Sequence, residues 1–172
     1  MNKNVKKIVM ASLMAALCCV ATMIIKIPTP LKGYLNLGDA IVLLSGWLLS
    51  PGYGFLAAGI GSALADVFSG YMVYAPATFV IKGVMALVTY YCFKYKKDGR
   101  LPRLISGSLA EFVMVFGYFI FESCLYGVVP SLANIPANAI QGVAGLLIGI
   151  RIMKIFEKKG VLNMTKSYDE KN

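Results

Sequence analysis

The stretch Tyr34-Leu35-Asn36-Leu37-Gly38-Asp39 separates two strongly apolar segments of this chain. Prolines and a glycine precede it, and an apolar run begins directly after its last residue. This pattern predicts a loop that ends at a helix, because the Asp39 carboxylate can cap free backbone N–H groups in the first turn. What the loop does depends on where a membrane lies along the chain.

The composition indicates an integral membrane protein. Of the 172 residues, 58% are hydrophobic and only 15% are charged, whereas a soluble domain carries about 25% charged residues. Long apolar stretches recur from one end to the other, which favours one compact unit in the lipid bilayer. We therefore expect a transmembrane substrate-binding domain at residues 1–160 and a cytoplasmic tail at residues 161–172.

The net charge of +9 does not indicate a nucleic-acid partner. Most basic residues fall in clusters between apolar segments, which is the pattern of cytoplasmic loops in membrane proteins. The chain contains no histidine, and its four cysteines lie inside apolar segments. Ser-His and Cys-His catalysis and the usual zinc sites are therefore excluded, and we expect neither an enzyme, nor a metal site, nor a cofactor.

Six apolar segments are predicted to form helices, at residues 5–25, 39–50, 55–69, 74–93, 104–126 and 134–155. The first could be a cleaved signal peptide, but its run of about 20 residues is long enough to span a bilayer and favours a retained helix. The second would be roughly 18 Å long, shorter than the ~30 Å hydrocarbon core. It could therefore be joined to the third as one broken span.

Charge decides between these topologies. The basic cluster at residues 94–103 and the basic N-terminus both belong in the cytoplasm, so an even number of spans must separate them. Fourteen of the 17 basic residues then lie inside, with Lys26 and Lys32 outside and Lys82 within the membrane. The sequence predicts an all-α, six-helix bundle in a bacterial cell membrane. Both its termini are cytoplasmic, and a structured outer loop joins helices one and two.

Three of the predicted helices carry polar stripes. Charged groups inside a membrane cost roughly 2.5–3.5 kcal/mol each on insertion scales, so each needs a reason. Residues spaced by three, four or seven share one face of a helix. The stripes comprise Thr78 and Lys82 on helix four, Glu111, Tyr118 and Glu122 on helix five, and Asn134, Asn138 and Gln141 on helix six. Given the direction of each helix, the stripes overlap in the outer half of the membrane.

Convergent polar groups in an apolar bundle are typical of a ligand site. We predict that this site comprises Tyr34, Asn36, Asp39, Thr78, Lys82, Tyr118, Glu122, Asn138 and Gln141. Alternatively, these groups satisfy one another, with Lys82 and Glu122 as an ion pair. We expect Asp39 at the outer rim, Asp66 at the outer interface, and Glu111 in a structural or partner-facing position. The evident aromatic candidates near this site are few, and they do not indicate a large stacked flavin.

Several stretches resemble the substrate-binding S components of energy-coupling factor (ECF) vitamin transporters, of the riboflavin type. They are Ala11-Ser12-Leu13-Met14-Ala15, residues 33–39, Ser50-Pro51-Gly52-Tyr53-Gly54 and the run from Ala63-Leu64-Ala65-Asp66 through residues 74–83. The resemblance implies a protein that binds one vitamin or precursor from outside, beneath the loop between helices one and two. A flavin, a pyridoxine-like vitamin and a thiamine-precursor heterocycle all remain open.

The resemblance also implies partners. S components dock onto a transmembrane T component and two cytoplasmic ATPases, and the face carrying Ala11 and Ala15 would make that contact. The sequence contains no phosphate-binding loop of its own, so active uptake would need an outside source of energy. The competing hypothesis is a stand-alone secondary transporter or channel that uses Glu122, Lys82 or Asp66 as an ion site.

Overall fold

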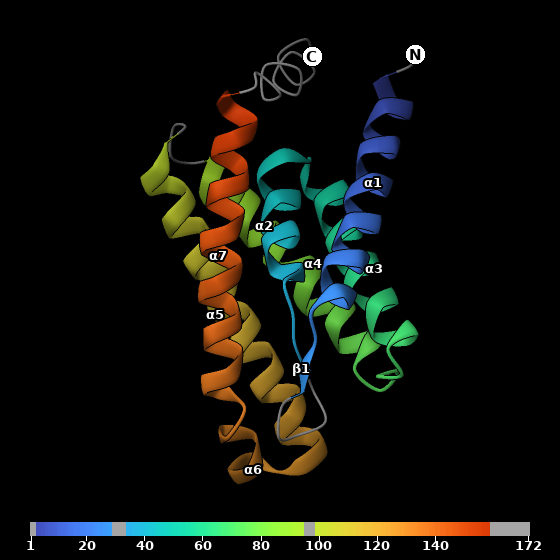
Figure 1. Ribbon diagram of the computed structural model, residues 1–172, viewed down its shortest axis with the longest axis vertical. Coiled ribbons are helices and arrows are strands. Elements are labelled where there is room, and N and C mark those ends of the chain that lie inside the picture. The colour runs from blue at the N-terminus through green and yellow to red at the C-terminus, as the bar shows by residue number, and fades with distance from the viewer. Residues whose placement is uncertain (1–2, 29–33, 95–98, 159–172) are drawn as a thin grey trace.

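A computed structural model describes residues 3–28, 34–94 and 99–158. Within these residues the chain forms one helical bundle with a short hairpin at one end (Figure 1). The main helices are α1 (Lys3–Ile24), α2 (Gly38–Leu48), α3 (Pro51–Phe68), α4 (Ala75–Lys94), α5 (Arg100–Tyr126) and α7 (Ile135–Lys158). The sequence did not predict the five-residue α6 (Val128–Leu132) between α5 and α7.

The prediction of a six-helix membrane bundle is confirmed. Helices α1, α4 and α5 and the continuous stretch Val128–Lys158 are long and apolar enough to cross a bilayer. Helices α2 and α3 stay separate, because the chain is extended at Leu49 and Ser50 and Pro51 begins the next helix, a position where its missing N–H costs nothing. Keeping them as two helices was therefore correct.

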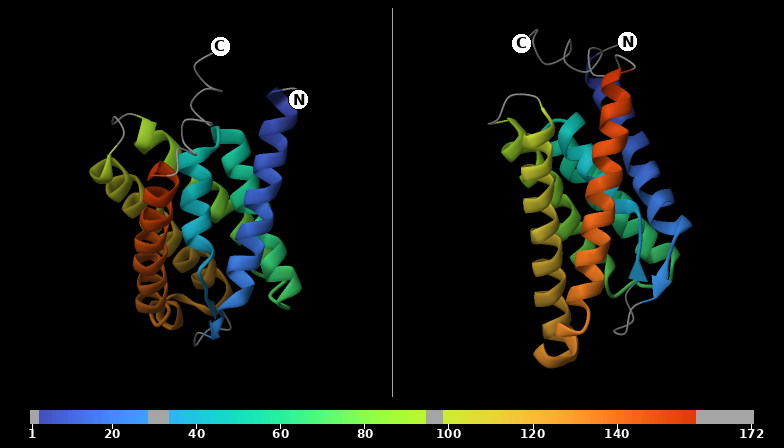
Figure 2. Two further views of the ribbon diagram at one scale, coloured as in Figure 1. Left: turned by 45° about the horizontal axis from the view of Figure 1, so that its top comes forward. Right: turned by 60° about the vertical axis from the view of Figure 1, so that its left-hand side comes forward.

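Both termini lie at the same end of the bundle, and the hairpin and α6 lie at the opposite end (Figures 1 and 2). This arrangement matches the even number of passes that the basic clusters require. The predicted division between the domain and its tail falls at residues 160–161, outside the described residues, so it stays a prediction.

The hairpin forms the outer loop between α1 and α2. Strand β1 (Ile27–Pro28) pairs antiparallel with β2 (Tyr34–Leu35), with Ile27 opposite Leu35. From β2 the chain runs into the bundle, so α2 begins near the middle of the molecule and not at its edge (Figure 1). This entry explains why α2 needs only 11 residues.

Helix α2 is the centre of the bundle, in contact with α1, α3, α4 and α7. Nine of its 11 residues are buried, so it is a core helix with little surface facing lipid. Close helix approach depends on small residues, as at Gly61 of α3, where an added Cβ would lie 2.4 Å from the Ala15 carbonyl oxygen of α1. Small residues at such positions let the helix backbones approach closely.

Candidate substrate pocket

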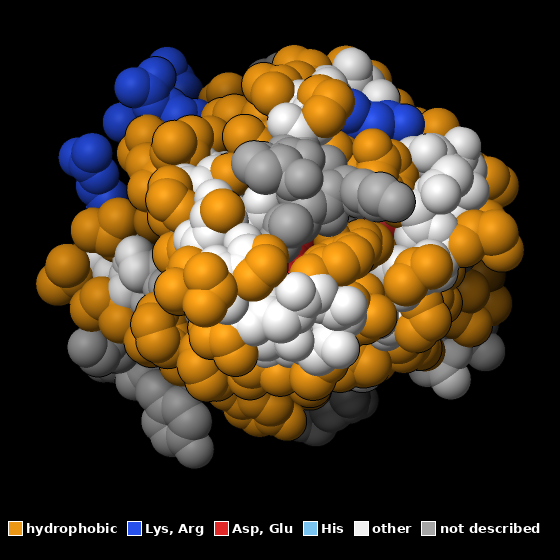
Figure 3. Space-filling view, turned by 90° about the horizontal axis from the view of Figure 1, so that it is seen from below, with side chains coloured by type: hydrophobic (Ala, Val, Ile, Leu, Met, Phe, Trp, Pro, Cys, Tyr) orange, Lys and Arg blue, Asp and Glu red, His pale blue; other side chains and the backbone are white. Residues whose placement is uncertain are grey.

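A small, partly polar pocket lies between the hairpin and the bundle. Its walls come from the hairpin, α3, α4, α5, α7 and the turn between α3 and α4. The lining residues are Tyr34, Asn36, Asp66, Tyr71, Tyr74, Thr78, Tyr118, Glu122, Asn138 and Gln141. Seen from the hairpin end, the surface is mostly apolar, and acidic atoms show only near its centre (Figure 3).

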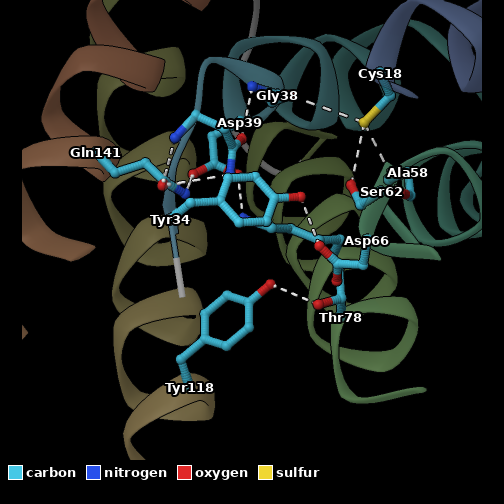
Figure 4. A network of polar contacts seen from close by, with 12 residues as sticks. Cys18, Tyr34, Gly38, Asp39, Ala58, Ser62, Asp66, Thr78, Tyr118 and Gln141 are labelled. Carbon is cyan, nitrogen blue, oxygen red and sulfur yellow. Dashed lines mark hydrogen bonds and ion pairs between the residues drawn. The ribbon is translucent and has the colours of Figure 1, made fainter. Parts of the chain in front are cut away.

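Tyr34 of β2 closes one side of the pocket. Its hydroxyl donates a hydrogen bond of 2.7 Å to Oδ1 of Asp66 on α3 (Figure 4), and its ring centroid lies 4.8 Å from that of Tyr71. Burial, together with the nearby Asp66 carboxylate, raises the pKa of Tyr34 above its ordinary value. The phenol therefore keeps its proton and acts as a donor at neutral pH.

Gln141 of α7 ties the outer loop to the bundle interior. Its Oε1 accepts a hydrogen bond of 2.9 Å from the backbone N–H of Asn36, and its Nε2 donates one of 2.6 Å to Oδ2 of Asp39. The Asn36 side chain in turn accepts from the Gly38 backbone at 2.9 Å. One carboxamide thus connects the loop to a buried charge.

The predicted role of Asp39 as a helix cap at the rim is wrong. The N-cap residue of α2 is Leu37, which makes no side-chain cap, and Asp39 lies inside the first turn, fully buried. Its Oδ1 forms an ion pair with the Lys82 ammonium of α4. A carboxylate this deep in a bundle is stabilised by an opposite charge more than by a cap.

The suggested ion pair between Lys82 and Glu122 is also wrong. Lys82 is paired with Asp39 and lies over the Tyr118 ring, 5.5 Å from its centroid. Oε1 of Glu122 instead accepts hydrogen bonds from Asn134 at 2.8 Å and from the Tyr74 hydroxyl at 3.4 Å. The polar stripes do satisfy one another in part, but through different partners from those first considered.

Seven of the nine predicted binding residues line the pocket: Tyr34, Asn36, Thr78, Tyr118, Glu122, Asn138 and Gln141. Thr78 and Tyr118 face each other across it, with their hydroxyls 2.9 Å apart (Figure 4). Asp39 and Lys82 do not line it; both are buried, and Asp39 is bonded to Gln141 and to Lys82. Glu111 lies outside the lining, buried next to Gly142 and Gly145 of α7, and within the described residues neither of its carboxylate oxygens has a hydrogen-bond partner.

Sequence reasoning missed three lining residues. Asp66 was assigned to the outer interface, yet it is only 5% exposed. Tyr71 and Tyr74 were not considered as lining, although they flank the turn after Gly70, which has a φ of 83°. The expectation of few aromatic groups is therefore wrong, since four tyrosines line the pocket. The sequence signal that could have identified them is the position of Tyr71 and Tyr74 a few residues after Asp66.

Within the described residues, no group of three or more metal-ligating side chains is close enough to hold a metal ion. The fold is that of a helical membrane protein with a partly polar pocket at the end opposite its termini. The chain belongs to the family of ECF-type riboflavin transporter S components, whose family model matches residues 2–158.

Two relatives extend this match. An uncharacterized protein of Pyrococcus woesei is 38% identical over 142 residues, which is 81% of this chain and 94% of the relative. The thiamine precursor transporter HmpT of Lactococcus lactis subsp. cremoris (strain MG1363) is 25% identical over 167 residues, which is 94% of each chain.

Solved structures agree with the fold. The S component of a bacterial ECF transporter superposes with a TM-score of 0.74 at 25% identity, covering 90% of this chain and 97% of the other. The S component for biotin from an ECF-type ABC transporter gives a TM-score of 0.57 at 19% identity, covering 90% and 95%, which shows the fold alone. The predicted family, helical membrane fold, S-component role and cell-membrane location are confirmed. A stand-alone transporter and an intramembrane enzyme are not supported.

Proposed function

We propose that this S component captures a small water-soluble vitamin or vitamin precursor in the lidded pocket and delivers it to an energised ECF module. The observation that carries the proposal is the double contact of Gln141, which lines the pocket, accepts from the loop at Asn36 and donates to Asp39 in the core. A ligand that contacts Gln141 would therefore affect both its bond to the loop at Asn36 and its bond to Asp39 in the bundle.

The pocket chemistry supports capture of a polar ring compound. Four tyrosines offer aromatic faces, while Asn138 offers an amide group that can accept and donate. Such a mixture buries a planar heterocycle and fixes its orientation at the same time. The names of the relatives point the same way, since one transports a thiamine precursor.

The loop acts as the lid in this proposal. For a ligand to enter, the bonds from Tyr34 to Asp66 and from Asn36 to Gln141 would have to open. Asn36 donates to Gln141 from both its backbone and its side-chain nitrogen, and each of these three bonds contributes only about 0.5–3 kcal/mol, which is small enough to be broken and reformed. A lid held by a few such bonds can close without trapping its cargo permanently.

Transport also needs the partners that the family implies, a T component and two ATPases, and we place their contact on α1. Ala11 is only 9% exposed and packs into the core of this chain, whereas Ser12 and Ala16 are exposed on the neighbouring face. Small exposed residues four apart allow another helix to approach closely. In this version of the proposal, Ala11 and Ala15 form the inner edge of the contact.

Binding is tested with the purified chain in lipid nanodiscs, by native mass spectrometry of co-purifying ligands and by calorimetry with a panel of vitamins and precursors. We expect Asn138→Ala and Gln141→Ala to weaken binding about tenfold or more. Glu157→Gln, at the opposite end of the bundle, is the matched control. Failure of the whole panel to bind would overturn the proposal.

Docking is tested by uptake in cells with and without the ECF module. Ala16→Leu should abolish uptake and leave the ligand affinity of the purified chain unchanged, because the added side chain points away from the bundle. Ala11→Leu should instead lower the stability of the chain itself, since this position is packed internally. Full uptake by the Ala16→Leu variant would place the docking face elsewhere.

A further inference from the structure

Two carboxylates on the pocket wall each keep one oxygen without a partner. Asp66 uses Oδ1 for the Tyr34 hydroxyl, while its Oδ2 is buried and makes no hydrogen bond within the described residues. Glu122 uses Oε1 for Asn134, while its Oε2 is likewise buried and unpaired there. Both residues are at least nine-tenths buried. An unpaired buried acceptor is costly, so these two oxygens need donors.

The described part of the wall supplies no cation for them. Among the described residues that line the pocket there are two carboxylates and neither lysine nor arginine. The nearby Lys82 is neutralised by Asp39. Lys26, outside the lining, lies 5.8 Å from the Tyr34 ring centroid and donates to Ser69. The charge of the wall is therefore left for a bound molecule to balance.

Several donors of the wall are already used within the protein. The Tyr34 hydroxyl donates to Asp66, the Gln141 amide nitrogen donates to Asp39, and one of the Thr78 and Tyr118 hydroxyls donates to the other. What the wall offers a ligand is thus weighted toward acceptors. A molecule rich in carbonyl oxygens or carrying a negative charge would leave the acidic oxygens unpaired.

We infer that the pocket selects an amino-substituted nitrogen heterocycle, a small planar ring with exocyclic N–H donors, and that Asp66 and Glu122 are the residues that recognise it. This inference rests on the proposed capture of a vitamin or precursor and names its chemical class. A protonated aminopyrimidine presents adjacent N–H groups, which can donate charge-assisted hydrogen bonds to the spare oxygens of these carboxylates. The tyrosine rings cover the faces of the heterocycle.

The test compares matched ligands on the unmodified protein in nanodiscs by calorimetry. The pyrimidine precursor of thiamine, which carries an amino and a hydroxymethyl group, is compared with its analogue in which an oxo group replaces the amino group. We expect the analogue to bind at least about 100-fold more weakly, because it presents an acceptor to the carboxylates. Riboflavin, which is rich in carbonyl groups, should also bind more weakly than the amino compound.

Two near-isosteric variants locate the recognition. Asp66→Asn and Glu122→Gln should each weaken binding of the amino compound about 10- to 100-fold. Each should also reduce the ratio between the affinities for the amino compound and for the oxo analogue. Glu157→Gln is the control, since it removes a carboxylate at the other end of the bundle and should change neither affinity. Thermal unfolding of each variant checks that the fold is retained, while the ligand pair on the unmodified protein needs no variant.

The outcomes separate the two proposals. Preference for the amino compound that depends on Asp66 and Glu122 supports the inference. Equal or tighter binding of the oxo analogue or riboflavin overturns the inference and leaves the vitamin-binding function standing, as does an undiminished preference in both variants. Absence of binding by every vitamin and precursor in the panel overturns the proposed function, and the inference with it.

Discussion

Asp39 and Asp66 are both buried carboxylates on helices that meet beneath the loop, but their partners differ. Asp39 has an ion pair with Lys82 on one oxygen and a hydrogen bond from Gln141 on the other. Asp66 has the Tyr34 hydroxyl on one oxygen and no partner on the second within the described residues. We call the first group, comprising Asp39, Lys82 and Gln141, the floor of the pocket.

The contrast separates a completely paired carboxylate from one with a spare oxygen. A buried ion pair that is completely hydrogen-bonded holds helices in a fixed arrangement, here α2, α4 and α7. A buried carboxylate with a spare oxygen costs stability unless something binds it. From the sequence we expected Asp39 in the site and Asp66 at the outer interface, whereas the structure puts Asp39 in the floor and Asp66 in the lining of the pocket.

Breaking the floor should have the largest effect. In Lys82→Met the Asp39 carboxylate loses its counter-charge, and we expect a loss of about 3–5 kcal/mol in the free energy of unfolding. Denaturant unfolding of the detergent-solubilised chain measures it. The double variant Asp39→Asn with Lys82→Met should recover most of the loss, because no uncompensated charge remains. A single variant as stable as the unmodified chain would remove the floor's structural role.

Gln141 connects the floor to the loop, so its loss should affect both stability and binding. Gln141→Met keeps a similar volume but leaves the Asn36 N–H and one Asp39 oxygen without partners. We expect a destabilisation of about 1–3 kcal/mol and ligand binding weaker by about tenfold or more, measured by unfolding and calorimetry on the same preparation. A loss of stability without a loss of affinity, or the reverse, would show that Gln141 does not couple the floor to ligand binding.

Tyr34→Phe tests the lid alone. It removes the hydroxyl that donates to Asp66 and keeps the ring against Tyr71. Because one hydrogen bond contributes about 1 kcal/mol, we expect dissociation of the ligand to become about fivefold faster with little change in unfolding. Stopped-flow displacement gives the rate. An unchanged rate would mean that this bond does not hold the loop closed.

The smallest effect is expected at the opposite end of the molecule, where Arg103 and Glu157 form a second ion pair. Glu157 is 37% exposed, so water already screens the pair, and the Arg103 guanidinium also lies over the Phe93 ring. Glu157→Gln should cost less than about 1 kcal/mol in unfolding free energy. A loss as large as that of Lys82→Met would contradict this ranking of the two ion pairs.

The helix count and most of the pocket could be predicted because they depend on local pattern. Helical spacing placed Thr78, Tyr118, Asn138 and Gln141 on inward faces, and charge counting placed those faces near the loop. Pairing could not be predicted the same way. The alternative considered above paired Lys82 with Glu122, because both were expected in the outer half of the membrane. In the structure the chain enters the bundle after β2, so Asp39 lies next to Lys82 and forms the ion pair instead.

The sequence by itself determined the membrane class, the six helices, their direction and the convergence of polar stripes at the outer end, because apolar length and charge clusters act locally. Only the tertiary structure decided which acidic groups are paired and which stay open. That outcome depends on where α2 starts along the bundle and on how closely α7 approaches it, with an added Cβ at Gly145 only 2.7 Å from the Asp39 Cβ. Neither the start of α2 nor the approach of α7 is encoded in any one segment, so the floor and the wall become distinct only when the helices pack.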